Sequence, residues 1–135
     1  MQINWFGVVL ALIAGTVVAF IWYQRGFIAN AWERLTGVTP ELSRTARARN
    51  MTQLLVANGV TALGLSAVIS AVTTAAGDDS VWLALLVGFA AWLAFSATTL
   101  LQHNAFELKP ARLTVINAGY QLALFLTMSA VIGLT

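Results

Sequence analysis

The chain has 135 residues, of which 59% are apolar and 9% are charged, and its formal net charge is +2. Soluble domains have about 45–50% apolar and about 25% charged residues, so a water-soluble fold of this length is excluded. The chain has no cysteine, which excludes disulfides and thiolate metal sites. Its basic residues cluster in two loops, which is a topology signal, and no nucleic-acid partner is expected.

Four apolar runs predict an all-α membrane protein whose single domain occupies residues 1–135, because about 20 apolar residues cross the ~30 Å hydrocarbon core of a bilayer. We expect a bundle of four transmembrane helices. The first run has no basic residue before it and ends in Trp22-Tyr23, an aromatic interface anchor, so we interpret it as a retained helix and not as a cleaved signal. The predicted helices cover residues 3–23, 51–76, 81–106 and 113–134.

Residues 24–50 form the one long polar segment. Apolar residues recur there at helical spacing opposite charged ones, which is typical of a short helix in the headgroup region or of an amphipathic linker. The apolar set is Phe27, Ile28, Ala31, Trp32 and Leu35, and the charged set is Arg25, Glu33 and Arg34. Thr39-Pro40 then offers an N-cap followed by proline at the first helical position, which predicts a second cytoplasmic helix.

The distribution of Lys and Arg predicts the orientation. Five lie in residues 24–50, none in the acidic turn 77–80 and two in residues 107–112. The positive-inside rule therefore places the two basic loops in the cytoplasm and both termini on the non-cytoplasmic side. We expect a multi-pass protein of the bacterial inner (plasma) membrane, surrounded by membrane lipids.

Small residues at every fourth position predict where helices pack closely, because lipid offers no hydrophobic drive for helix association. Each set forms one stripe along its helix, and the neighbour is either in the same chain or in another subunit. The sets are Gly7, Ala11, Gly15 and Ala19 in the first helix, and Ala62, Ser66, Ser70 and Thr74 in the second.

A short internal similarity accompanies these stripes. Residues 56–59, Val-Ala-Asn-Gly, resemble residues 115–119, Val-Ile-Asn-Ala-Gly, and each stretch follows a basic loop. One interpretation is a pair of helical hairpins in parallel repeat, as in some transporters, and the other is coincidence.

Polar residues of the cytoplasmic half are the candidate site, because an unpaired amide or imidazole in hydrocarbon costs several kcal/mol. They either hydrogen-bond neighbouring helices or form a polar vestibule for a small ligand, a lipid headgroup or an ion. The candidates are Asn58, Thr99, His103, Asn104, Glu107, Asn117, Tyr120 and Gln121. Five positions of the third helix form one predicted stripe: Gly88, Trp92, Ser96, Thr99 and His103.

His103 and Glu107 are spaced i, i+4 and are the one pair with conventional chemistry. Zinc generally needs three or four protein ligands, and no nucleophile is evident beside the pair. We therefore expect no metal, no cofactor and no catalytic residue. An enzyme acting on a lipid or quinone is a further alternative that would rest on this pair alone.

Several short motifs resemble the domain of unknown function 1761 family of small bacterial membrane proteins. The motifs are Asn4-Trp5, Trp22-Tyr23 and Ala31-Trp32, then residues 98–101 and 104–107, Pro110, and residues 116–120. The resemblance covers essentially the whole chain and implies a four-helix membrane protein with no established activity. Family members tend to have asparagine where this chain has His103, whereas Asn104, Glu107, Asn117 and Tyr120 fit the family pattern.

Two functions are expected from these features. The first is a homo-oligomer, most simply a twofold dimer, that binds or passes a small solute or ion through the polar cytoplasmic half. The second is a structural or regulatory accessory subunit that packs its small-residue stripes against a larger membrane protein.

Overall fold

Helices make up 86% of the residues that the structure describes, and no strand occurs among residues 3–24 and 28–135. The structure is a computed structural model. Arg25 and Phe27, which the sequence pattern placed on a short amphipathic helix, lie outside the described residues. The elements are α1 (Trp5–Trp22), α2 (Ala29–Thr36), α3 (Pro40–Thr45), α4 (Arg47–Ala76), α5 (Val81–Ala91), the π-helical η1 (Trp92–Ala97), α6 (Thr98–Phe106) and α7 (Ala111–Leu134).

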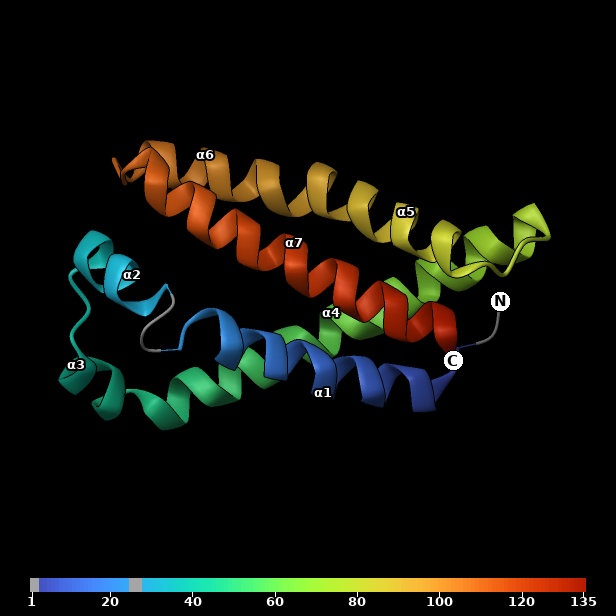
Figure 1. Ribbon diagram of the computed structural model, residues 1–135, viewed down its shortest axis with the longest axis horizontal. Coiled ribbons are helices and arrows are strands. Elements are labelled where there is room, and N and C mark those ends of the chain that lie inside the picture. The colour runs from blue at the N-terminus through green and yellow to red at the C-terminus, as the bar shows by residue number, and fades with distance from the viewer. Residues whose placement is uncertain (1–2, 25–27) are drawn as a thin grey trace.

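Four helical stretches are long and apolar enough to cross a membrane, namely α1, α4, α7 and the continuous stretch Val81–Phe106. They run alternately in opposite directions, so both ends of the chain and the turn at residues 77–80 lie at one end of the molecule (Figure 1). The opposite end holds α2, α3 and the turn between α6 and α7, and we call it the α2/α3 end.

Local capping sets several helix boundaries. The Thr39 Oγ1 accepts a hydrogen bond from the Leu42 backbone N–H at 3.2 Å, so α3 begins at Pro40. Gly37 and Gly77 end α2 and α4 with φ angles of 74° and 64°, the left-handed conformation that favours glycine. α4 starts at Arg47, one turn before the predicted helix that begins at residue 51.

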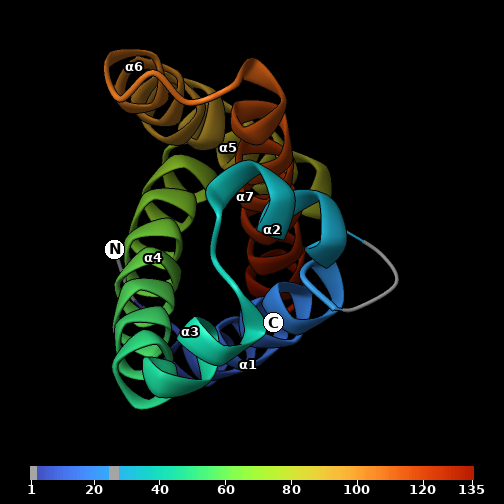
Figure 2. The same ribbon diagram turned by 90° about the vertical axis from the view of Figure 1, so that its left-hand side faces the viewer.

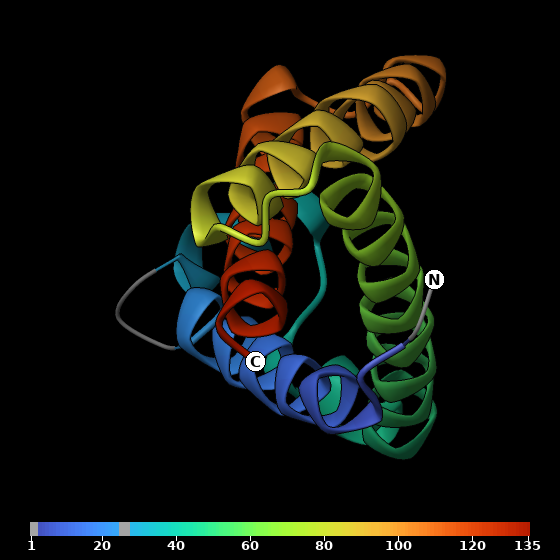
Figure 3. The same cartoon turned by 90° about the vertical axis from the view of Figure 1, so that its right-hand side faces the viewer.

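α7 is the central helix and packs against α1 on one side and α5 on the other, with α4 contacting all three (Figures 2 and 3). Small residues permit these approaches. Gly15 of α1 faces the Leu124 and Met128 side chains, and Gly88 of α5 faces the Ser129 side chain. The whole α1 stripe is buried, as are Ala62 and Ser66 of α4, whereas Ser70 is half-buried.

The η1 segment changes which residues of the stretch Val81–Phe106 face the rest of the bundle. π-helical hydrogen bonds join residues i and i+5, so the backbone rotates differently from an α-helix over these residues. Before and within η1, Gly88 is buried and the Trp92 Nε1 donates to the Ala118 carbonyl at 2.9 Å. After it, Asn104 is buried and Thr99 and His103 are exposed. The predicted stripe from Gly88 to His103 therefore does not lie on one face.

We expect Gly88→Leu to destabilise the fold by about 1–3 kcal/mol or more, because a Cβ there meets the Ser129 side chain and lies 3.2 Å from the Phe125 carbonyl oxygen. Thermal unfolding in mild detergent measures the effect. The matched control is Gly64→Leu, since no atom lies within 4 Å of a Cβ at that position. Equal unfolding temperatures for the two variants would contradict the α5–α7 packing.

Candidate functional site

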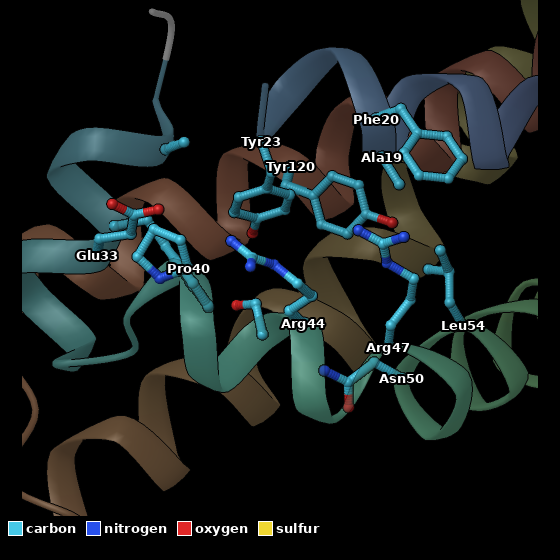
Figure 4. Close-up of a pocket in the computed structure, with 13 residues that line it drawn as sticks. Ala19, Phe20, Tyr23, Glu33, Pro40, Arg44, Arg47, Asn50, Leu54 and Tyr120 are labelled. Atoms are coloured by element: carbon cyan, nitrogen blue, oxygen red, sulfur yellow. The ribbon is translucent and has the colours of Figure 1, made fainter. Parts of the chain in front are cut away.

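A cavity of about 730 Å³ lies at the α2/α3 end (Figure 4). Ligand pockets in proteins are typically ~300–1,000 Å³, so its size suits a small molecule. Five helices supply or border its lining, namely α1, α2, α3, α4 and α7; α2 packs against α7, and α3 packs against α4. The lining residues are Ala19, Phe20, Tyr23, Ala29, Trp32, Glu33, Pro40, Ser43, Arg44, Arg47, Asn50, Leu54 and Tyr120.

Two tyrosines form the rear wall of the cavity. The ring centroids of Tyr23 and Tyr120 are 5.1 Å apart in an edge-on arrangement, and Trp32 lies 5.8 Å from Tyr23 in the same manner. The Tyr23 hydroxyl donates to the Asn117 Oδ1 at 2.7 Å. These contacts join the end of α1 to α2 and α7.

Two arginines supply the charge of the cavity. Arg44 on α3 and Arg47 on α4 point their guanidinium groups toward the two tyrosines (Figure 4). Neither is paired with a carboxylate among the residues that the structure describes. Glu33 lies on the other side of the cavity, beside Pro40. Two positive groups against one negative group favour an anion in the cavity.

The side of the cavity toward the middle of the molecule is apolar, with Ala19, Phe20 and Leu54. Phe20 lines the cavity and is 56% exposed, so this residue borders both the cavity and the outer surface of α1. One turn beyond Leu54, Asn58 is 3% exposed, and its Nδ2 has no hydrogen-bond partner among the residues that the structure describes. A buried amide without a partner is uncommon in proteins.

Part of the candidate site predicted from the sequence lies at this cavity. Tyr120 lines it, Asn117 holds the Tyr23 hydroxyl, and Asn58 is close to the Tyr120 side chain. Gln121 is half-buried beside Tyr120 in sequence but does not line the cavity.

The other candidates lie on α6 or just after it, away from the cavity. Asn104 donates from its Nδ2 to the Thr114 Oγ1 at 3.0 Å, and the Thr99 hydroxyl donates to the Phe95 carbonyl of its own helix at 2.6 Å. His103 and Glu107 are exposed, and no ion pair joins them in the described part of the chain. No group of three or more His, Cys, Asp or Glu side chains that could hold a metal occurs among the described residues.

Most residues of the cavity were not predicted as a site from the sequence, and the polar or aromatic ones among them include Arg44, Arg47, Asn50, Tyr23 and Trp32. In the sequence, the arginines were interpreted only as a signal of membrane orientation. The Thr39 N-cap was the signal available for Arg44, because it predicts a helix on which Arg44 follows one turn later. No local pattern shows that this helix lines one cavity together with the end of α1.

A second cavity, of about 390 Å³, lies at the opposite end of the molecule. α4 reaches both cavities, since Leu54 lines the first and Ser66 the second. Asn58 and Ala62 follow Leu54 at steps of four residues and are buried between the two cavities.

The comparisons with known proteins agree with the resemblance found in the sequence motifs. No curated protein and no solved structure matches the chain. Residues 6–133 match the family described as "Protein of unknown function (DUF1761)". Since this match covers nearly the whole sequence, the resemblance is confirmed, and the chain belongs to the DUF1761 family.

Proposed function

We propose that this chain is a multi-pass membrane protein that binds a small anionic solute in the cavity at its α2/α3 end. The observation that carries the proposal is the pair Arg44 and Arg47, which point into a ligand-sized cavity without a carboxylate partner in the described residues. Guanidinium groups form strong charge-assisted hydrogen bonds with carboxylate or phosphate oxygens. An anion would therefore satisfy both arginines at once.

We further propose that the four apolar helices form a transmembrane bundle in the bacterial inner membrane, with the α2/α3 end in the cytoplasm. The charge distribution supports this orientation, because all Lys and Arg residues fall in residues 24–50 and 107–112. Both segments belong to the α2/α3 end of the molecule (Figure 1). The solute would then be taken from the cytoplasmic side.

Passage of the solute is the second candidate function, and the second cavity favours it. α4 lines both cavities with one face, on which Asn58 lies between them with its Nδ2 unpartnered. In this conformation the stretch around Ala62 is closed, since Ala62 and Met128 are both 0% exposed. Passage would require α4 to move relative to α7.

An accessory subunit would need a contact surface other than the predicted stripes. The α1 stripe is already buried within the chain, where Gly15 faces α7, and Ala62 of α4 is buried too. A second copy of the chain or a larger partner would therefore meet a different face.

We expect single cysteines to report the orientation, because the chain has no cysteine of its own. Ala76→Cys lies beside the acidic turn and Thr45→Cys ends α3, and both positions are exposed. In intact bacterial cells a membrane-impermeant maleimide should label Ala76→Cys at once, and Thr45→Cys only after the membrane is opened. The reverse pattern would invert the proposed topology.

We expect the double variant Arg44→Gln/Arg47→Gln to bind anions about fivefold to tenfold more weakly per arginine removed, since each interaction is worth ~1 kcal/mol. Thermal unfolding in detergent with phosphate, sulfate and hexanoate measures the binding. Arg49→Gln is the control, because Arg49 is an exposed arginine of the same helix outside the cavity lining. If added anions raised the unfolding temperature of the double variant as much as that of Arg49→Gln, the anion site would lie elsewhere.

For passage, we expect Asn58→Leu to lower flux of the bound anion into liposomes by tenfold or more, a rough figure for losing a buried amide that lies between the cavities. Leucine is close to asparagine in size, so the helix packing should persist. Glu107→Ala serves as the control because Glu107 is exposed and lines neither cavity. Undiminished flux in Asn58→Leu at matched protein density would exclude this path.

A further inference from the structure

We propose that the molecule held at the α2/α3 end is an anionic phospholipid, with its phosphate between Arg44 and Arg47 and its acyl chains beside Phe20 and Leu54. This inference rests on the proposed function and names the chemical class of its ligand. It follows from the two contrasting walls of the cavity and from the depth at which each wall lies.

The polar wall has the chemistry of a phosphate site. Arg44 and Arg47 approach from two different helices, so their guanidinium groups can bind different oxygens of one phosphate (Figure 4). Asn50 follows Arg47 on α4 and also lines the cavity, which adds an amide donor. The Tyr23 hydroxyl is already engaged by Asn117, so the arginines carry the recognition.

The apolar wall offers no favourable contact to a free inorganic anion. Leu54 and Phe20 line the cavity, and Phe20 also belongs to the exposed surface of α1. The outward face of α1 continues this surface, with Val17 49% and Ile21 53% exposed beside Phe20. A ligand that fills the cavity therefore needs an apolar portion that extends along the outer surface of α1. A diacyl lipid has one.

The distance between the two walls along α4 matches the separation of the phosphate and the acyl chains in a lipid of one leaflet. Leu54 lies seven residues beyond Arg47 on α4, which corresponds to about 10 Å along a helix. With Arg47 at the start of the spanning helix, at the level of the headgroups, Leu54 lies at the level of the upper acyl chains. The phosphate and the chains of a single lipid are separated along the same axis.

The net charge of the lining selects among lipids. Arg44 and Arg47 give two positive charges and Glu33 gives one negative charge, so the lining is net positive. Phosphatidylglycerol, which carries a net negative charge, is favoured over phosphatidylcholine, which carries none.

The first experiment uses native mass spectrometry of the full chain, delipidated in detergent and mixed with phosphatidylglycerol, phosphatidylcholine or sn-glycerol 3-phosphate. We expect one phosphatidylglycerol per chain to be retained, at least about tenfold more than in Arg44→Gln/Arg47→Gln. Arg49→Gln should retain as much as the unaltered chain. Arg44→Lys/Arg47→Lys keeps the charge and should recover part of the retention, so a general loss of folding is distinguished from loss of the site.

The second experiment tests the apolar wall. Phe20→Ser should lower phosphatidylglycerol retention severalfold. Phe6→Ser is its matched control, because Phe6 is an exposed phenylalanine of the same helix that lies outside the cavity. Equal retention in these two variants would overturn the placement of the acyl chains.

The outcomes separate the two proposals. If sn-glycerol 3-phosphate is retained as well as phosphatidylglycerol, in an arginine-dependent manner, the solute site stands and the lipid assignment is overturned. If phosphatidylcholine is retained equally, the arginines do not select the lipid and the assignment is again overturned. If no probe depends on Arg44 and Arg47, both the lipid assignment and the proposed anion site are overturned.

Discussion

The close approach of α7 to α1 and α5 is the constraint on which the rest of the molecule depends. Apolar side chains gain little by leaving lipid for a helix interface, so packing must come from backbones that come close together. Glycines on α1 and α5 leave room for the larger Leu124, Met128 and Ser129 of α7. Once α7 is fixed in this way, its other end holds Asn117 and Tyr120 at the end of α1. The rear wall of the cavity is thus a result of packing elsewhere in the bundle.

The sequence predicted the helical class, which depends on local composition and helical periodicity. The predicted stripe of α1 is buried, whereas that of α4 is buried only at Ala62 and Ser66, with Ser70 half-buried and Thr74 exposed. Gly15 and Ala62 could be recognised as buried positions from their spacing alone. The central position of α7 could not be recognised, since many of the residues that it buries, such as Leu124 and Met128, are bulky. Such residues look the same in sequence whether they face lipid or a neighbouring helix.

The candidate site was predicted in part for similar reasons. Asn117 and Tyr120 occupy one regular helix, so their common face followed from their spacing. The stripe that ended at His103 assumed a regular α-helix, and the π-helical η1 turned later residues to other faces. Arg44 faces the cavity because the short α3 packs against the start of α4, which itself supplies Arg47. That arrangement is tertiary and leaves no periodic trace in the sequence.

The tyrosines and the arginines of the cavity are held in place by different parts of the molecule. The tyrosines belong to the packed ends of α1 and α7, whereas Arg44 lies on the short α3, which contacts the bundle mainly through α4. Substitutions in residues 28–45 can therefore change the charge at the cavity mouth while the helix interfaces stay intact. A helix bundle with this division can change the charge of its cavity through a few exposed positions, and at little cost in stability.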